Sequence, residues 1–308
     1  MGAPYPALRY EFDVMKQIEF EDKSWSLLSN KIIQIKRKIE EAGKTLEQYN
    51  TKIRLGLATG ANEVFVINQE KRDELIGYDA RNSELFKPVL RGRDIHRYKY
   101  EHSDFYIILS KSGTDIAKKY PKLYQYFDSF GEKFKKRGAK GEHWTNLRHC
   151  AFFDDFKEQK IVWIELTDRG RFALCSEEIY LVNSAYFLIP PKELSAKYLL
   201  AILNSNLINF YLKIIAETSG MGTSRWINNY VKEFPIANDK TKKSNEVIKI
   251  VDQILSITKD SDYLENPDKK AKVKKLEKEI DQLVYKLYEL TPDEIKIVED
   301  FVNEKNKN

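Results

Sequence analysis

The sequence is poor in cysteine and has neither a strong excess of one charge nor a membrane-length apolar run. Cys150 and Cys175 are its only cysteines, which is too few for a disulfide framework and typical of a reducing compartment. His149 lies beside Cys150, but no second Cys or His pair completes a zinc site. Because signal-peptide and lipidation motifs are also missing, we expect a cytoplasmic protein with no membrane contact and no metal.

The charge of the chain is nearly balanced. Its 308 residues include 52 Lys and Arg against 47 Asp and Glu, which gives a formal net charge of +5. This mild excess is not that of a histone-like binder, whereas sequence-specific DNA readers often carry a local basic face on a balanced body. The distribution of the basic residues is therefore more informative than their total.

Short strand-like runs alternate with turns between residues 52 and 190, at 64–67, 105–109, 160–165, 172–175, 179–182 and 186–189. They predict an α+β fold with a mixed or mostly antiparallel sheet. We expect a helix from a Ser29 cap to about residue 49, and an apolar helix over 194–216 that is buried against the sheet.

The chain changes character after Pro235 and becomes charged, with helical spacing of its apolar residues. Segments 244–258, 268–290 and 292–304 predict a C-terminal helical hairpin or bundle. We therefore expect a linker or artificial start at 1–22, one domain at 23–236 and a helical region at 237–308.

Two neighbouring segments carry most of the functional signal. Residues 53–67 are predicted to be two strands of a hairpin joined by a turn with Thr59, Gly60 and Asn62. Residues 87–98 follow as a basic turn that contains Arg91, Arg93 and Arg97. Small polar groups beside guanidinium groups suit an anionic ligand such as duplex DNA, although Thr59 and Asn62 can also serve only to stabilise their own turn.

These segments resemble the TaqI-like C-terminal specificity domain of type IIG restriction–modification enzymes and related adenine-N6 DNA methyltransferases. The family pattern Gly-x-x-Thr-Gly-x-Asn-x-x-Phe is matched at 56–65, and Leu-Arg-Gly-Arg-Asp-Ile-x-Arg-Tyr at 90–98. Further matches follow in family order at 144–148, 199–205 and 279–291. The ordered series spans most of the chain, from about residue 25 to about residue 301.

The resemblance implies a double-stranded DNA target-recognition domain without catalytic activity of its own. The parent protein would carry methyltransferase and nuclease domains upstream, as partners of this chain, and would use S-adenosylmethionine and magnesium there. Within this chain we expect no cofactor. We also expect a monomer.

The sequence also lacks the catalytic motifs of a methyltransferase and of a nuclease. A base-flipping methyltransferase needs an Asn/Asp-Pro-Pro-aromatic loop, and the only Pro-Pro pair, Pro190-Pro191, follows Ile189. A nuclease needs two acids and a lysine arranged around a metal. Suitable residue types are crowded at 154–160 or lie at a helix start at 293–296, so neither group has the usual strand-separated arrangement.

Further basic residues extend the predicted binding surface. A flexible basic loop at 130–149 can follow phosphates with Trp144 as its anchor, unless it is a solvated lysine loop with Trp144 in the core. A hairpin turn at 168–172 can read guanine through arginine, unless Asp168 simply pairs with Arg171. The glycine-rich loop 219–225 either covers a phosphate or is a plain connector. The remaining candidate DNA contacts are Lys135, Lys136, Arg137, Lys140, Trp144, Arg148, Arg169, Arg171 and Arg225.

Two other functions remain open at this point. A single-repeat type I specificity subunit resembles the same arrangement, with its helices pairing two copies or docking a modification subunit. A protein-interaction scaffold would use the helical tail as its binding surface, and its DNA binding would be weak and indifferent to sequence.

Overall fold

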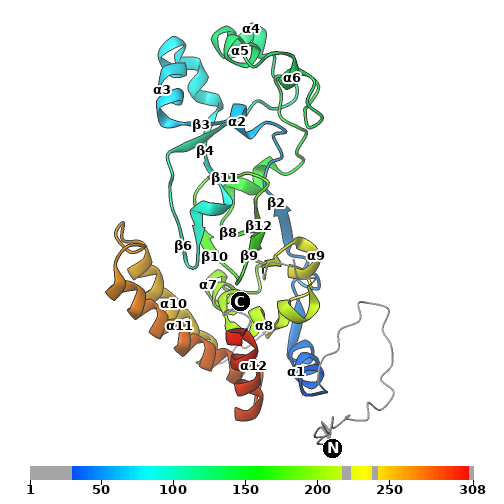
Figure 1. Ribbon diagram of the computed structural model, residues 1–308, viewed down its shortest axis with the longest axis vertical. Helices are drawn as coiled ribbons and strands as arrows, with labels where there is room; N and C mark the ends of the chain where they lie inside the picture. The colour runs from blue at the N-terminus through cyan, green and yellow to red at the C-terminus, as the bar shows by residue number, and fades with distance from the viewer. Residues whose placement is uncertain (1–29, 217–222, 238–241, 305–308) are drawn as a thin grey trace, which may run out of the picture.

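The computed structural model describes residues 30–216, 223–237 and 242–304. Its centre is an antiparallel four-stranded sheet in the order β10-β8-β12-β2 (Figure 1). The strands are β10 (Phe172–Cys175), β8 (Lys160–Ile164), β12 (Ala185–Ile189) and β2 (Lys52–Leu55). The strands expected at 160–165, 172–175 and 186–189 are confirmed.

A second four-stranded sheet, in the order β11-β4-β7-β3, forms the upper part of the molecule in Figure 1. Its strands are β11 (Tyr180–Leu181), β4 (Phe86–Leu90), β7 (Phe105–Ile108) and β3 (Val66–Asn68). Only the β11–β4 pair is parallel. Strand β4 occupies the start of the segment that was expected to be a basic turn, and the turn itself is the 3-10 helix η2 (Gly92–Asp94).

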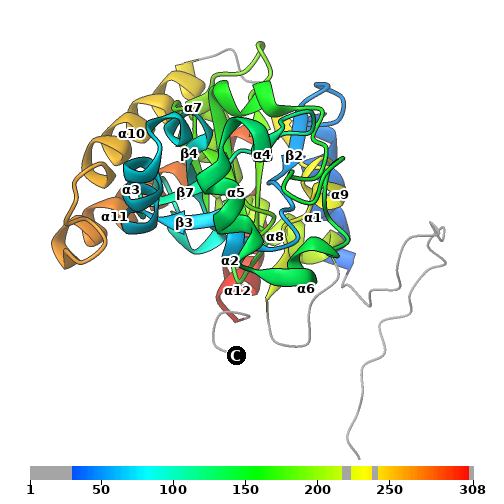
Figure 2. The same cartoon turned by 90° about the horizontal axis from the view of Figure 1, so that it is seen from above.

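Short helices cover the second sheet, and Figure 2 shows them from above. Leu75, Leu123, Phe127 and Phe134 are among their buried side chains and pack with the apolar residues of the sheet. The helices are α3 (Gln69–Tyr78), η1 (Ala80–Leu85), α4 (Ile116–Lys119), α5 (Pro121–Asp128) and α6 (Gly131–Lys135), while η3 (Phe153–Lys157) precedes β8.

The hairpin expected at 53–67 is wrong. Strand β2 pairs with β12 in the central sheet, whereas β3 pairs with β7 in the second sheet. The chain crosses from one sheet to the other through a bridge between Leu57 and Val182, and then through the turn before α2 (Asn62–Phe65). Phe65 is fully buried, so helix α2 turns an apolar side chain into the core at the start of the segment where a strand was expected.

Two long helical predictions are divided in the structure. The helix expected from Ser29, which lies outside the described residues, is α1 (Asn30–Glu41) and ends before β1 (Gly43–Thr45), because Gly43 enters a pair with β14 (Pro235–Ala237). A Cβ at Gly43 would lie 2.2 Å from the carbonyl oxygen of Ile236. The apolar segment 194–216 is two helices, α7 (Ala196–Asn204) and α8 (Asn206–Ile215), bent by 62° where Ser205 caps α8.

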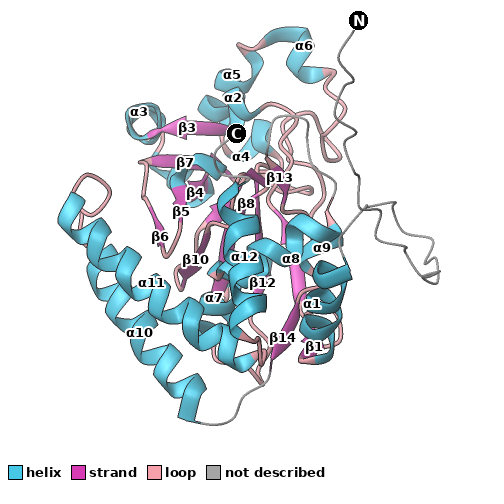
Figure 3. Cartoon of the chain, turned by 60° about the horizontal axis from the view of Figure 1, so that its bottom comes forward, coloured by secondary structure: helices cyan, strands magenta, loops and turns pink. Residues whose placement is uncertain are grey.

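Helices α10 (Lys242–Thr258), α11 (Pro267–Leu287) and α12 (Pro292–Glu304) confirm the expected helical region. Figure 3 shows α10 and α11 along one side of the molecule, with α12 beside α8. Their apolar faces share one core with α1, α7, α8 and one face of the central sheet, so packing is continuous across residue 237. The domain boundaries at 22 and 236 stay predictions.

The remaining elements are small. They are the ribbon β5 (Ile95–His96) with β6 (Lys99–Tyr100), the ribbon β9 (Leu166–Thr167) with β13 (Ser224–Arg225), and α9 (Asn228–Val231). Together the helices and mostly antiparallel sheets confirm the α+β fold. Among the described residues, no single helix is long and apolar enough to span a membrane, and the apolar side chains of the bent pair α7 and α8 are buried in the protein.

Candidate nucleic-acid interface

A surface hollow of about 430 Å³ lies where the two sheets meet. Asn62, Arg91 and Arg93, three of the residues singled out in the sequence, line this hollow. Val66 and Phe105 come from the second sheet, and the rest of the wall is Gly92, Ile164, Val182 and Ser184. The crossover from β2 to β3 and the turn after β4 therefore bring both family motifs to one place.

The first wall of the hollow is the turn that leads into α2. The Thr59 hydroxyl donates to the Asn62 side-chain oxygen at 2.6 Å and accepts the N–H of Ala61 at 3.1 Å. Thr59 is buried, so its side chain holds the turn in shape. Asn62 is exposed, and its amide nitrogen has no hydrogen bond within the described part of the chain. Thr59 thus acts as a local support, and Asn62 presents a free donor.

Another wall is the turn that contains Arg91 and Arg93. Arg91 donates to both carboxylate oxygens of Asp94, at 3.0 and 2.9 Å, and its guanidinium lies 3.8 Å from the centre of the Phe105 ring. Burial of Asp94 opposes its ionisation, but the hydrogen bonds from Arg91 outweigh this and lower the pKa of the carboxyl. Arg93 is exposed and has no ion pair or hydrogen bond among the described residues. It is therefore the free cation of the hollow.

Arg97 and Arg169 lie elsewhere, between the central sheet and α11. The Arg97 Nε lies 2.7 Å from a Glu277 oxygen, and its Nη1 donates to the Gly170 carbonyl at 3.1 Å. Burial is the largest single effect and lowers the pKa of Arg97, but the charges of Glu277, Tyr98 and Asp281 and the hydrogen bond to Glu277 together outweigh it, so the net shift is upward. The charge of Arg97, followed by burial, lowers the pKa of Arg169. Both side chains thus belong to a joint with the helical tail.

Arg171 pairs with Asp168 at 3.1 Å across its own turn, which is the arrangement expected of an ordinary exposed turn. Arg225 pairs with Glu165 at 2.7 Å, at the end of the β9–β13 ribbon beside the exposed Leu166. Of the glycine-rich loop at 219–225, only residues 223–225 are described. As DNA contacts, Arg97, Arg169, Arg171 and Arg225 stay predictions.

Arg137 lies at the centre of the basic segment, residues 130–149, and is only 8% exposed. Its guanidinium donates to the carbonyls of Thr59 at 3.1 Å and Asn146 at 2.7 Å, and also to those of Trp144 and Phe134. Burial lowers the pKa of Arg137 to about 10. The segment expected to be a flexible loop is therefore tied to the turn that carries Asn62, because one buried arginine bonds to both.

The rest of this segment is partly paired. Lys135 contacts Asp128 at 2.7 Å and lies 5.3 Å above the Trp144 ring, while Lys136 is 3.8 Å from Glu132. Trp144 is half-buried against Tyr124 and Phe134, so most of its ring belongs to the apolar cluster. Lys140 donates to the Lys135 carbonyl. Arg148 is exposed and has no partner in the described ranges.

Several of the groups considered for metal binding are engaged within the protein. Asp155 pairs with Lys52 at 3.2 Å and Arg54 at 3.0 Å. The buried Lys160 donates to three carbonyls, those of Phe156, Glu158 and Glu177. Glu294 accepts the N–H of Thr291 and pairs with Lys38 at 2.9 Å. Within the described residues, no three His, Cys, Asp or Glu side chains are placed to hold a metal ion.

Sequence reasoning missed three members of the hollow. Phe105 was recognised as part of a strand, but nothing in the local pattern placed its ring under Arg91. Ser184, which accepts the N–H of Gly92 at 3.0 Å, and Ile164 come from distant segments with no motif of their own. Only the pairing of strands brings them to the site.

Both a family model and a curated protein match parts of this chain. Residues 87–236 match the family model described as the TaqI-like C-terminal specificity domain. The chain is 21% identical over 287 residues to the type II methyltransferase M.BstVI of Geobacillus stearothermophilus, a match that covers 91% of this chain and 46% of that protein. The chain thus spans about half the length of this curated relative.

Two solved structures are also similar. The type IIL restriction–modification enzyme MmeI, solved in complex with DNA, has a TM-score of 0.57 at 13% identity, over 83% of this chain and 35% of that one. This likeness concerns the fold. The type IIG restriction endonuclease BpuSI has a TM-score of 0.48 at 13% identity, over 84% of this chain and 33% of that one, and this score is too low to support a conclusion.

Proposed function

Because residues 87–236 belong to the TaqI-like C-terminal specificity domain family, we propose that the chain recognises a specific sequence in double-stranded DNA. It does so as the specificity module of a longer type II restriction–modification enzyme of the type IIG class. The observation that carries this proposal is the meeting of Asn62, Arg91 and the unpaired Arg93 around one hollow.

The chemistry of the hollow suits the edge of a base pair. An arginine guanidinium donates two parallel hydrogen bonds to guanine, and an asparagine amide pairs with adenine in the same way. Arg91 is held by Asp94 and Phe105, so it stiffens the wall from which Arg93 projects. Thr59 likewise fixes Asn62. A side chain that is already held in place, as Asn62 is, loses little entropy on binding.

The basic segment beside the hollow provides the second type of contact. Lys136, Lys140 and Arg148 are exposed there, and Arg137 bonds this segment to the turn of Asn62. Contacts to phosphates set the register and general affinity, while contacts to bases set the sequence. We assign Lys136, Lys140 and Arg148 to phosphates, and Arg93 and Asn62 to bases.

The catalytic steps belong to other parts of the parent protein in this proposal. The charged side chains of the hollow are arginines and no carboxylate lines it, a composition that does not fit magnesium, which binds oxygen ligands. Adenine-N6 methylation with S-adenosylmethionine and magnesium-dependent cleavage are accordingly assigned to the upstream domains. The protein would act on DNA in the cytoplasm.

Selection of randomised duplex DNA on the purified chain tests the proposal, with Arg93→Ala as the diagnostic variant. Wild type should enrich a motif, and the variant should lose discrimination at one base pair by about 1–3 kcal/mol. Arg81→Ala is the matched control, because Arg81 is exposed, pairs only with Asp79 and does not line the hollow. A wild-type chain that enriches no motif, or an Arg93→Ala selection identical to wild type, would contradict this assignment.

Two structural features weigh against the other candidate functions. Apolar residues of α10–α12, such as Val251, Ile280 and Val298, are buried against the chain's own body. Among the described residues, the exposed large apolar side chains are Leu55, Tyr78, Phe130 and Leu166, and none of these lies on α10–α12. Pairing of two copies through these helices, or an apolar scaffold surface on them, therefore lacks the side chains it needs.

A further inference from the structure

The first half of α11 carries a dense set of lysines. Residues 268–279 contain six lysines and three acidic residues. Lys270, Lys272, Lys274, Lys275 and Lys278 are all exposed, and none of them makes an ion pair with another described residue. Exposed like charges three or four residues apart on a helix repel one another, so this surface gains from an anionic ligand.

The acids nearby do not neutralise this surface. Glu277 points away from it to Arg97, with the oxygen and nitrogen 2.7 Å apart. Asp281, one turn further on, is buried and accepts the N–H of Asn206 at 2.7 Å. Lys269 is the one lysine of the group that is compensated, by Asp260 at 2.8 Å and by Asp262. The other five lysines are thus unpaired within the described chain, and they outnumber the two exposed acids of this segment, Asp268 and Glu279.

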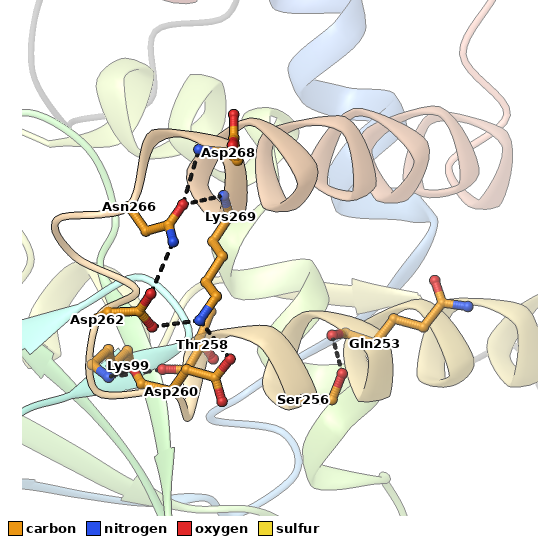
Figure 4. Close-up of polar contacts among 9 residues, drawn as sticks. All are labelled: Lys99, Gln253, Ser256, Thr258, Asp260, Asp262, Asn266, Asp268 and Lys269. Carbon is orange, nitrogen blue, oxygen red and sulfur yellow. Dashed lines mark hydrogen bonds and ion pairs between the residues drawn. The ribbon is translucent and has the colours of Figure 1, made fainter.

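This helix is held firmly to the recognition domain. Figure 4 shows the loop between α10 and α11, where Lys99 of strand β6 donates to the carbonyls of Thr258 and Asp260, each at 2.8 Å. In the same view, Asn266 caps α11 by accepting two backbone N–H groups, and Lys269 closes the loop onto Asp262. With the Arg97–Glu277 pair, these contacts fix the basic face relative to the β5–β6 ribbon.

The same ribbon leads back to the hollow. Arg93 and Arg97 are four residues apart, so their Cα atoms are separated by at most about 14 Å. Arg97 then contacts Glu277 directly. Lys270, Lys274 and Lys278 follow one another at four-residue spacing, and Lys274 and Lys278 flank Glu277. The end of the stripe at Lys274 and Lys278 therefore lies within about one turn of duplex, about 34 Å, from the hollow.

We propose that the stripe of Lys270, Lys274 and Lys278 is a second DNA contact, which binds the phosphodiester backbone of the same duplex outside the sequence read at the hollow. This inference rests on the proposed function and extends it to the helical tail. Lysine is a strongly hydrated point charge that suits phosphate without selecting a base. The stripe adds affinity and orientation, and the choice of sequence stays with the hollow.

The test compares the full chain with Lys270→Gln/Lys274→Gln/Lys278→Gln by measuring the DNA dissociation constant over a range of salt concentrations. Each lost phosphate contact lowers the slope of log K against log salt by about 0.9, so the slope should fall by about 2–3. The motif enriched from random DNA should stay the same. Lys118→Gln/Lys119→Gln/Lys122→Gln removes the same charge from exposed positions of α4 and α5, which lie at the opposite end of the molecule (Figure 1), and should leave the slope unchanged.

Two outcomes overturn the inference. A slope equal to that of wild type, with the variant folded, shows that the stripe does not meet DNA and belongs to an acidic protein partner or to solvent. An equal fall in both triple variants shows a general charge effect without a site. The proposed function has a separate test, because it fails if wild type enriches no motif from random DNA. The salt slope can still be measured in that case, on any duplex that the chain binds.

Discussion

At the residue scale, the arginines of this chain divide into those that bind the protein itself and those left for a ligand. Arg97 and Arg137 direct their guanidinium groups to a carboxylate or to backbone carbonyls inside the fold. Arg91 is intermediate, because it lines the hollow while bonded to Asp94. Arg93 is exposed and unpaired within the described chain. The local surroundings of each side chain, more than its motif, therefore indicate its role.

Replacing Arg137 with alanine should destabilise the protein by about 3 kcal/mol. The change leaves buried carbonyls without a donor and opens a cavity, and each unsatisfied buried polar group costs about 1–3 kcal/mol. Urea unfolding measures the effect. Lys136→Ala is the control and should change the unfolding free energy by less than about 0.5 kcal/mol, because Lys136 is exposed. Equal stability of both variants would show that Arg137 is not a structural hub.

The sequence motifs could predict which residues line the hollow, but they could not predict the partner of each arginine. The motifs identified Asn62, Arg91 and Arg93 together, and the structure places all three at one hollow. The same motifs could not separate them from Arg97, because its partner Glu277 lies 180 residues away. Burial by distant segments leaves no mark on the local pattern.

At the element scale, the turn before α2 connects the hollow with the basic segment, because it carries Asn62 and accepts a hydrogen bond from Arg137 at the Thr59 carbonyl. Gly60 has φ +69°, a left-handed conformation that glycine adopts readily. A Cβ at this position would also lie 2.9 Å from the Ala139 side chain and carbonyl. The basic segment can therefore approach the turn closely only where residue 60 is glycine.

Gly60→Ala should cost more stability than Gly113→Ala. Both positions have positive φ, at +69° and +83°, but no atom lies within 4 Å of a Cβ at Gly113. Backbone strain alone costs about 1–2 kcal/mol, and we expect about 1 kcal/mol more at Gly60 for displacing Ala139. Thermal or urea unfolding of the two variants measures the difference. Equal losses would mean that the basic segment is not packed on the turn.

Elements with strong local signals were predicted well, whereas the strand pairing of segment 53–67 was not. Runs such as 160–165 and 172–175 are strands because β-branched and aromatic side chains fit a pleated, half-buried surface. The hairpin at 53–67 failed because β2 pairs with β12 and β3 pairs with β7. The break at Ser205 was also missed, since the apolar residues of α7 and α8 form one run in the sequence.

At the scale of the whole molecule, recognition domain and helical tail meet at a joint that contains buried charge. Glu277 and Asp281 of α11 lie one turn apart, with Arg97 facing Glu277 and Asn206 at the start of α8 donating to Asp281. Glu299 of α12 accepts the Tyr285 hydroxyl at 2.6 Å beside them. The sequence showed a helix here, but this cluster forms only when α8, α11 and α12 pack together.

Asp281 makes the stability of this joint depend on pH. Burial raises the pKa of its carboxyl to about 7, against the opposing effects of the Asn206 N–H and Arg97, whereas the unfolded value is about 3.9. The folded protein thus holds a proton that the unfolded chain has lost between these values. The resulting stabilisation is fully present below about pH 4 and is lost as pH rises through about 7.

Asp281→Asn should remove this loss, because the amide oxygen still accepts the Asn206 N–H while the side chain carries no charge. The difference in unfolding free energy between variant and wild type should shift in favour of the variant by about 2–4 kcal/mol from pH 4 to pH 8. Urea unfolding at both pH values measures this difference. Asp293→Asn, at an exposed position at the start of α12, is the control and should show no comparable shift. If the Asp281→Asn difference is the same at both pH values, Asp281 is already ionised in the folded protein at pH 4, and the joint is held together as an ordinary ion-pair network around Arg97.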